Sequence, residues 1–108
     1  MKVIIKLCLN ICYQLDRLQI DKGEMSHPHK HILINKYEIV KFIDFERARK
    51  RPNPANVTGF LSFLGKHEMT TLLADKGIML DRKQLIGCSR EYQKGDMELN
   101  NLFTCLNL

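Results

Sequence analysis

Two carboxylates, twenty positions apart, are the residues of this chain best suited to carry chemistry. Glu24 lies in a polar stretch, GEMSHPHKH, and Asp44 comes near the end of a run of β-forming residues, YEIVKFIDF. Phosphoryl transfer needs one carboxylate to orient or deprotonate the attacking hydroxyl and a second, rigidly held one to bind magnesium at the nucleotide phosphates. The structural alternative is an exposed loop acid at Glu24 and a turn or cap residue at Asp44.

Histidines alternate along the same polar stretch, at His27, His29 and His31. Imidazoles on one side of an extended segment suit zinc or copper. Structural zinc sites usually add nearby cysteines or carboxylates, and no cysteine lies between Cys12 and Cys88. We therefore favour a polar loop that is rich in histidine over a zinc site.

A basic segment follows Asp44, with Arg47, Arg49, Lys50 and Arg51 close together. Such a segment could contact the phosphates of RNA or an acidic protein partner. A run this short is more often a solvated loop, and no aromatic residue interleaves with it to stack on bases.

The elements that position these residues follow from the hydrophobic period. Apolar residues at spacings of three and four over residues 3–19 predict an amphipathic helix, with Asp16, Arg17 and Gln19 on its solvent face. HILI and YEIVKFIDF predict a β-hairpin with a tight turn at Asn35. In its second strand, Val40, Phe42 and Asp44 would share one face.

The remainder is predicted to be helical, after a loop around ARKRPNPANV. The signals are a cap near Asn53 or Asn56, stops at Gly65, Gly77 and about Gly95, a capping box of Asp81 with Gln84, and a last cap at Asp96.

Composition places this chain among folded, soluble proteins. Its 108 residues fit one small domain, and the net charge of +5 favours acidic partners. No stretch approaches the roughly 20 apolar residues of a membrane span, and no small-residue cleavage site follows the apolar start. We expect a cytoplasmic protein without membrane contact, whose four cysteines are reduced and buried because they show no paired short spacing.

The stretch LDRLQIDKGEMSHPHKHILINKYEIVKFIDFERARKRPNPANVTGFLSFL resembles the predicted serine/threonine protein kinases of archaea, relatives of the RIO-type and other atypical kinases. In that family a helix leads into a catalytic loop, a short hairpin follows, and IDFERA stands where ordinary kinases carry Asp-Phe-Gly. The resemblance runs from about Lys6 to about Tyr92. It implies an α+β fold, in which residues 1–108 form a mainly helical, protein-kinase-like carboxyl-terminal lobe with one short β-hairpin.

The resemblance also implies roles for individual residues. Asp44 matches the magnesium-binding Asp, and Glu24, within KGEM, matches the catalytic-loop Asp. His31 occupies the place of a metal-binding Asn, and Lys30 would lie near the transferred phosphate. Arg47 would begin an activation-type loop. The implied cofactors are ATP and Mg²⁺, and the implied partner is a protein substrate.

Two departures from the family qualify this expectation. Glu is longer than Asp at position 24, and His at position 31 prefers softer metals than magnesium. The chain also starts at the helix before the catalytic loop, so we expect it to lack the amino-terminal lobe that grips ATP and to be inactive alone. Apolar surface left by a missing lobe would favour self-association. The alternative is a non-catalytic helical module that binds an acidic partner or RNA through residues 47–51.

Overall fold

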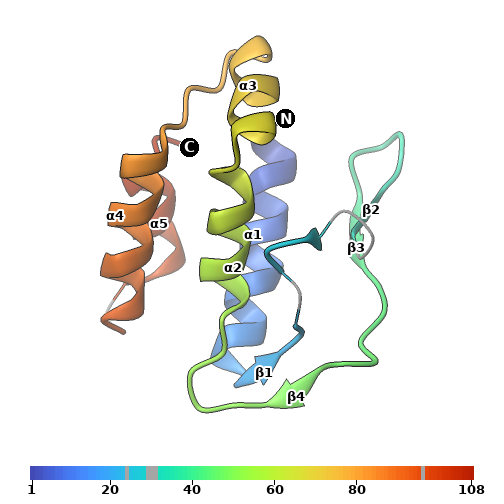
Figure 1. Cartoon of the computed structure of the whole chain (residues 1–108). Coiled ribbons are helices and arrows are strands. Elements are labelled where there is room, and N and C mark those ends of the chain that lie inside the picture. Colours follow the sequence, from blue (N-terminus) through green and yellow to red (C-terminus); the bar gives the residue numbers. More distant parts are fainter. Residues whose placement is uncertain (24, 29–31, 96) are drawn as a thin grey trace.

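The computed structural model describes residues 1–23, 25–28, 32–95 and 97–108, and their arrangement is an α+β fold (Figure 1). Its elements in chain order are α1 (Lys2–Arg17), β1 (Ile20–Asp21), β2 (Ile32–Ile34), β3 (Val40–Phe42), β4 (Arg49–Lys50), α2 (Asn56–Leu64), α3 (His67–Asp75), α4 (Arg82–Gln93) and α5 (Leu99–Cys105). The predicted α+β class, mainly helical with a short β-hairpin, is confirmed.

Helix α2 lies at the centre of the helical part, between α1 and α4, and α5 packs on both α1 and α4. The β-hairpin lies on the other side of the α1–α2 pair from α4 (Figure 1). The core is formed by the inward faces of these helices, which bury Leu9 of α1, Leu61 of α2, Leu85 of α4 and Leu102 of α5. None of the helices in the described part is both long enough and apolar enough to cross a membrane.

The first helix is confirmed, but one residue on its expected solvent face is not in solvent. Asp16 is half-buried and accepts a hydrogen bond of 2.6 Å from the hydroxyl of Tyr92 on α4. It also accepts from the backbone N–H groups of Asn56 and Val57, which begin α2. The prediction for Asp16 was wrong because the start of α2 has unpaired N–H groups that need an acceptor.

The hairpin is confirmed as an antiparallel pair of β2 with β3, in which Ile34 lies opposite Val40. The Asn35 side chain organises the connection, since its Oδ1 accepts from the backbone N–H groups of Tyr37 at 2.8 Å and Ile39 at 3.0 Å. The connection covers residues 35–39 and is longer than the predicted tight turn.

A second strand pair was not predicted. β1 pairs with β4 in antiparallel register, with Ile20 opposite Lys50 and Asp21 opposite Arg49. The basic segment is therefore only partly a loop, because two of its residues form a strand. This pairing brings the chain that follows the hairpin back to the end of α1 (Figure 1).

The carboxyl-terminal helices begin and end close to the predicted signals. The Asp81 side chain accepts from the Gln84 backbone N–H at 2.9 Å and caps α4. Gly77 and Gly95 follow α3 and α4 with φ of +81° and +93°, a conformation that glycine adopts without strain.

The predicted caps for α2 and α5 have different outcomes. The predicted cap of α2 by Asn53 or Asn56 is wrong, since Ala55 is the residue before the helix and the Asp16 side chain accepts from the first N–H groups of α2. The Asn56 side chain instead forms buried hydrogen bonds. Asp96, the expected cap of the last helix, lies outside the described residues.

The expectation of four reduced cysteines is half correct. Cys8 and Cys12 are free and buried on α1, and burial raises the pKa of the Cys8 thiol to about 11. Cys88 and Cys105 form a disulfide that joins α4 to α5, with their Cα atoms 6.0 Å apart. Spacing along the chain did not reveal this pair, because it depends on how the two helices pack.

Candidate functional site

Asp44 lies in a turn two residues beyond β3 and is exposed. Its φ of +62° is in the left-handed region, which asparagine and aspartate adopt more readily than most residues. Its Oδ1 accepts a long hydrogen bond of 3.4 Å from the Glu46 backbone N–H. Asp44 was expected to share a strand face with Val40 and Phe42; instead the strand ends at Phe42 and the backbone has turned before Asp44.

Lys22 contacts this turn and was not predicted as a site residue. Its side chain is 2% exposed, which is rare for a lysine. Its Nζ donates to the Asp44 carbonyl oxygen at 3.0 Å and lies 5.0 Å from the centre of the Phe45 ring. A buried ammonium needs such partners, and in bonding the Asp44 carbonyl it holds the turn in place.

The backbone of Lys22 is also fixed, by Asn56 at the start of α2. The fully buried Asn56 accepts from the Lys22 N–H at 2.9 Å through Oδ1 and donates to the Ile20 carbonyl at 2.6 Å through Nδ2. The same Nδ2 donates to Asp16 at 2.9 Å. Asn56 thus joins α1, the strand β1 and the segment after it in one hydrogen-bonded unit.

The electrostatics of that unit are dominated by Asp16. Burial raises the pKa of the Asp16 carboxyl above its ordinary value of 3.8, and hydrogen bonds from Tyr92, Asn56 and Val57 partly offset this. The pKa of the Tyr92 hydroxyl is raised by burial and by its bond to Asp16. Nothing in the sequence period marked these residues as partners.

Asp21 connects the basic segment to the residues that follow β1. Its Oδ1 accepts from the Gly23 N–H at 2.8 Å, and its Oδ2 pairs with the Arg51 guanidinium at 3.3 Å. The Ala55 N–H donates to the same carboxylate. Arg51 therefore has a structural partner, and Lys50 Nζ donates to the Leu18 carbonyl at 3.4 Å, although both residues of β4, Arg49 and Lys50, are exposed.

Three predicted site residues, Glu24, Lys30 and His31, lie outside the described residues. On either side of position 24, described residues contact other segments: Lys22 lies by the Asp44 turn, and Met25 is 3% exposed against Gly59 of α2. The structure therefore places one predicted site residue, Asp44, and adds Lys22 and Asn56, which the sequence patterns did not indicate.

The expected metals can be compared with the side chains present. Magnesium is usually held by one or two carboxylates together with phosphate oxygens and water, and the exposed carboxylate of Asp44 suits that mode. Of the alternating histidines, His27 is described; it is exposed, with Nδ1 3.2 Å from the Ser26 hydroxyl. Within the described ranges, no three histidine, cysteine or acidic side chains gather as a metal site.

Neither a protein-family model nor a curated protein matches this chain.

Proposed function

We propose that this chain is the carboxyl-terminal lobe of an atypical serine/threonine protein kinase of the archaeal type. It would transfer a phosphoryl group from ATP to a protein substrate once an amino-terminal lobe completes the nucleotide site. The observation that carries the proposal is the bond from Lys22 Nζ to the Asp44 carbonyl at 3.0 Å. It joins the segment that leads to Glu24 to the turn that presents the Asp44 carboxylate.

The strand pairs support the same arrangement. β2 with β3 delivers the chain to Asp44, and β1 with β4 returns it beside the residues that precede Glu24. The segment between β1 and β2 and the segment between β3 and β4 are thereby joined by a strand pair at each end. Phosphoryl transfer depends on positioning and on electrostatic stabilisation, so a braced pair of loops is what the reaction requires.

In this proposal, Asp44 would hold Mg²⁺, which would neutralise the charge of the ATP phosphates. Glu24 accepts the proton of the substrate hydroxyl, and Lys30 lies near the transferred phosphate. His31 is the weaker candidate for a second metal contact, because imidazole suits softer metals. Lys22 is a positioning residue, since it acts on the Asp44 backbone.

The test is to fuse the full chain to the amino-terminal lobe of an archaeal kinase and to measure phosphate transfer from labelled ATP to a protein substrate. We expect transfer in the presence of Mg²⁺. Asp44→Asn should abolish transfer while keeping the turn, because asparagine tolerates the same left-handed backbone. Glu46→Gln, a change of the same kind two residues away, is the control and should keep it. Full transfer by Asp44→Asn would refute the role of Asp44.

A second candidate function is binding of an acidic partner or RNA by the basic segment. The observation in its favour is that Arg49 and Lys50 are exposed on β4 while Arg51 is engaged by Asp21. Reversing the charge of Arg49 and Lys50 should then remove binding of a short RNA in a filter assay, and Asp44→Asn should not. If RNA binding is unchanged by the reversal, this function is ruled out for the segment.

A further inference from the structure

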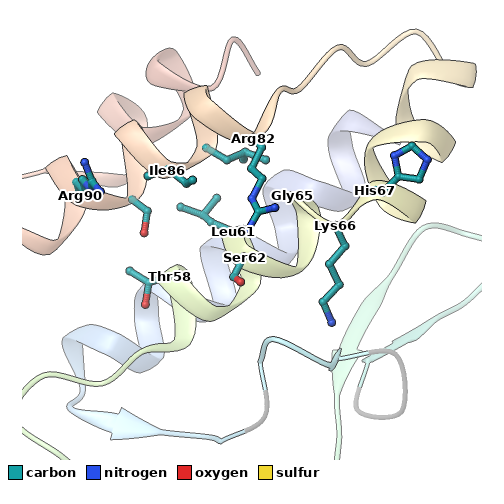
Figure 2. Close-up of a pocket in the computed structure, with 11 residues that line it drawn as sticks. Thr58, Leu61, Ser62, Gly65, Lys66, His67, Arg82, Ile86 and Arg90 are labelled. Atoms are coloured by element: carbon teal, nitrogen blue, oxygen red, sulfur yellow. The ribbon is translucent and has the colours of Figure 1, made fainter.

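A hollow of about 510 Å³ lies between α2 and α4, and the start of α3 closes one end of it (Figure 2). Its volume is within the range of roughly 300–1,000 Å³ that is common for small-molecule sites. α4 lies on the side of α2 away from the hairpin (Figure 1), so the hollow is separate from the Asp44 turn. The proposed kinase function makes no use of it.

The hollow is lined by positive charge. Arg82 and Arg90 both come from α4, and eight residues of helix place their Cα atoms about 12 Å apart along the axis. Among the residues that the structure describes, no acidic side chain lines the hollow. Within the described part of the chain, neither guanidinium has an ion pair or a hydrogen bond. Lys66, also at the rim, turns its ammonium away and donates to the Ser26 carbonyl at 2.9 Å.

Two residues of α2 that carry hydroxyl groups, Thr58 and Ser62, also line the hollow. In Figure 2 the Arg82 guanidinium reaches across the hollow toward Ser62 and Gly65, and Thr58 lies farther along α2, toward Arg90. Gly65 keeps this end narrow, since a Cβ there would lie 3.4 Å from a Leu85 methyl carbon. A guanidinium fork and a hydroxyl therefore converge at the Arg82 end.

The middle of the hollow is apolar. Leu61 and Leu85 are buried beneath it, and Ile86, which lies between the two arginines on α4, is 42% exposed. An inorganic ion would leave this surface uncovered. A ligand with an anionic group and an apolar body would contact both parts.

We propose that this hollow binds a small organic phosphate, with the phosphate between Arg82 and Ser62 and the organic body over Leu61 and Ile86. Guanidinium N–H groups match phosphate oxygens in pairs, and the Ser62 hydroxyl supplies a further donor. Phosphate has more acceptor oxygens than a carboxylate, which suits donors that approach from two helices. Arg90 then attracts the far end of an elongated ligand.

The test is a titration of the full chain followed by NMR of its backbone amides, with phenyl phosphate as the probe. We expect shifts at residues 61–66 and 82–90, and tighter binding of phenyl phosphate than of inorganic phosphate or benzoate. Arg82→Gln should weaken binding about tenfold or more, the scale of a charge-assisted pair. Ser62→Ala should weaken it less.

The matched control is Lys83→Gln, which removes the same charge from the next residue of α4 but does not line the hollow. It should bind as the unchanged chain does. An equal loss in Lys83→Gln would mean that net charge alone attracts the probe and would overturn the proposal. So would equal affinity for benzoate, or shifts confined to other surfaces.

Discussion

The Asp44 side chain depends on a backbone conformation that few residues adopt. Its left-handed φ is tolerated because a short polar side chain can bond to the local backbone, here the Glu46 N–H. The Lys22 ammonium then fixes the carbonyl on the other side of the same residue. A carboxylate held in this way is exposed but has a defined direction, which metal binding with phosphate requires.

Substitutions at Asp44 should distinguish the contribution of the turn conformation to stability from that of the carboxylate charge. Asp44→Ala should lower the free energy of unfolding by about 1–2 kcal/mol. Alanine is strained in a left-handed backbone conformation, and it cannot accept the hydrogen bond from the Glu46 N–H. Asp44→Asn should lower the free energy of unfolding clearly less, because asparagine tolerates the left-handed backbone and its side-chain oxygen still accepts from the Glu46 N–H. Urea unfolding followed by circular dichroism measures the difference. Equal losses would show that the carboxylate charge, and not the turn, governs stability here.

Asp16 should give stability a distinctive dependence on pH. Burial raises its pKa in the folded chain above 3.8, so the folded state holds the proton more tightly than the unfolded state does. The contribution of Asp16 to stability is therefore fully present below pH 3.8 and declines as the pH rises toward the folded pKa.

Asp16→Asn should remove that decline. The check is the difference in unfolding free energy between the two proteins, measured by urea unfolding at several pH values from about 3.5 upward. The unchanged chain should lose stability relative to Asp16→Asn as the pH rises. A difference that is constant with pH would contradict the assignment.

At the scale of elements, the disulfide joins α4 to α5, which also pack on each other. Cys88 and Cys105 close a loop with a sequence separation of 17, and closing a loop of this length stabilises a fold by about 3 kcal/mol. Reduction, or Cys105→Ser, should therefore lower the free energy of unfolding by about that amount. Urea unfolding with and without reductant measures it.

A control keeps that test specific to the bridge. Adding reductant to Cys105→Ser should change nothing further, because the bridge is already absent and the thiols of Cys8, Cys12 and Cys88 are all buried. A further loss would point to another effect of the reductant.

Which elements could be predicted depended on whether their signals are local. The helices and the hairpin follow from period, capping residues and turn residues that lie within one segment, as at Asp81 and Asn35. The β1–β4 pair was missed because two-residue strands have no period and their pairing spans about thirty residues. The disulfide was missed for the same reason.

The site was predicted less completely than the fold. Asp44 was found because an acid after a β-forming run is visible in the sequence, but its turn geometry was not. Lys22, Asn56 and Asp16 act through contacts between distant segments, so no spacing could reveal them. A buried lysine or asparagine looks in sequence like any surface polar residue.

At the scale of the whole molecule, a compact fold leaves large apolar side chains of the hairpin uncovered. The radius of gyration is 13.1 Å, close to the roughly 13 Å expected of a folded chain of this length. The hairpin nevertheless exposes large apolar side chains, at Leu33, Ile34, Tyr37 and Ile39. Phe45, beside Asp44, is also exposed. In our proposal an amino-terminal lobe covers these side chains.

When the chain is studied by itself, the exposed apolar side chains of the hairpin should drive self-association. Replacing both Tyr37 and Ile39 by Ser should reduce association in sedimentation velocity runs over a range of concentrations. Met79→Ser is the control, because Met79 is 76% exposed but lies in the connection between α3 and α4. Association that Met79→Ser reduces and the hairpin double variant leaves unchanged would place the contact elsewhere.

The most direct test of the kinase proposal is a titration of the full chain with ATP, with and without Mg²⁺, followed by amide NMR. We predict magnesium-dependent shifts at residues 22–23 and 44–46, which Asp44→Asn removes and Glu46→Gln keeps. The hollow between α2 and α4 could add shifts, but they would not depend on magnesium. Shifts at the Asp44 turn that are the same without Mg²⁺, or that persist in Asp44→Asn, would contradict the proposal.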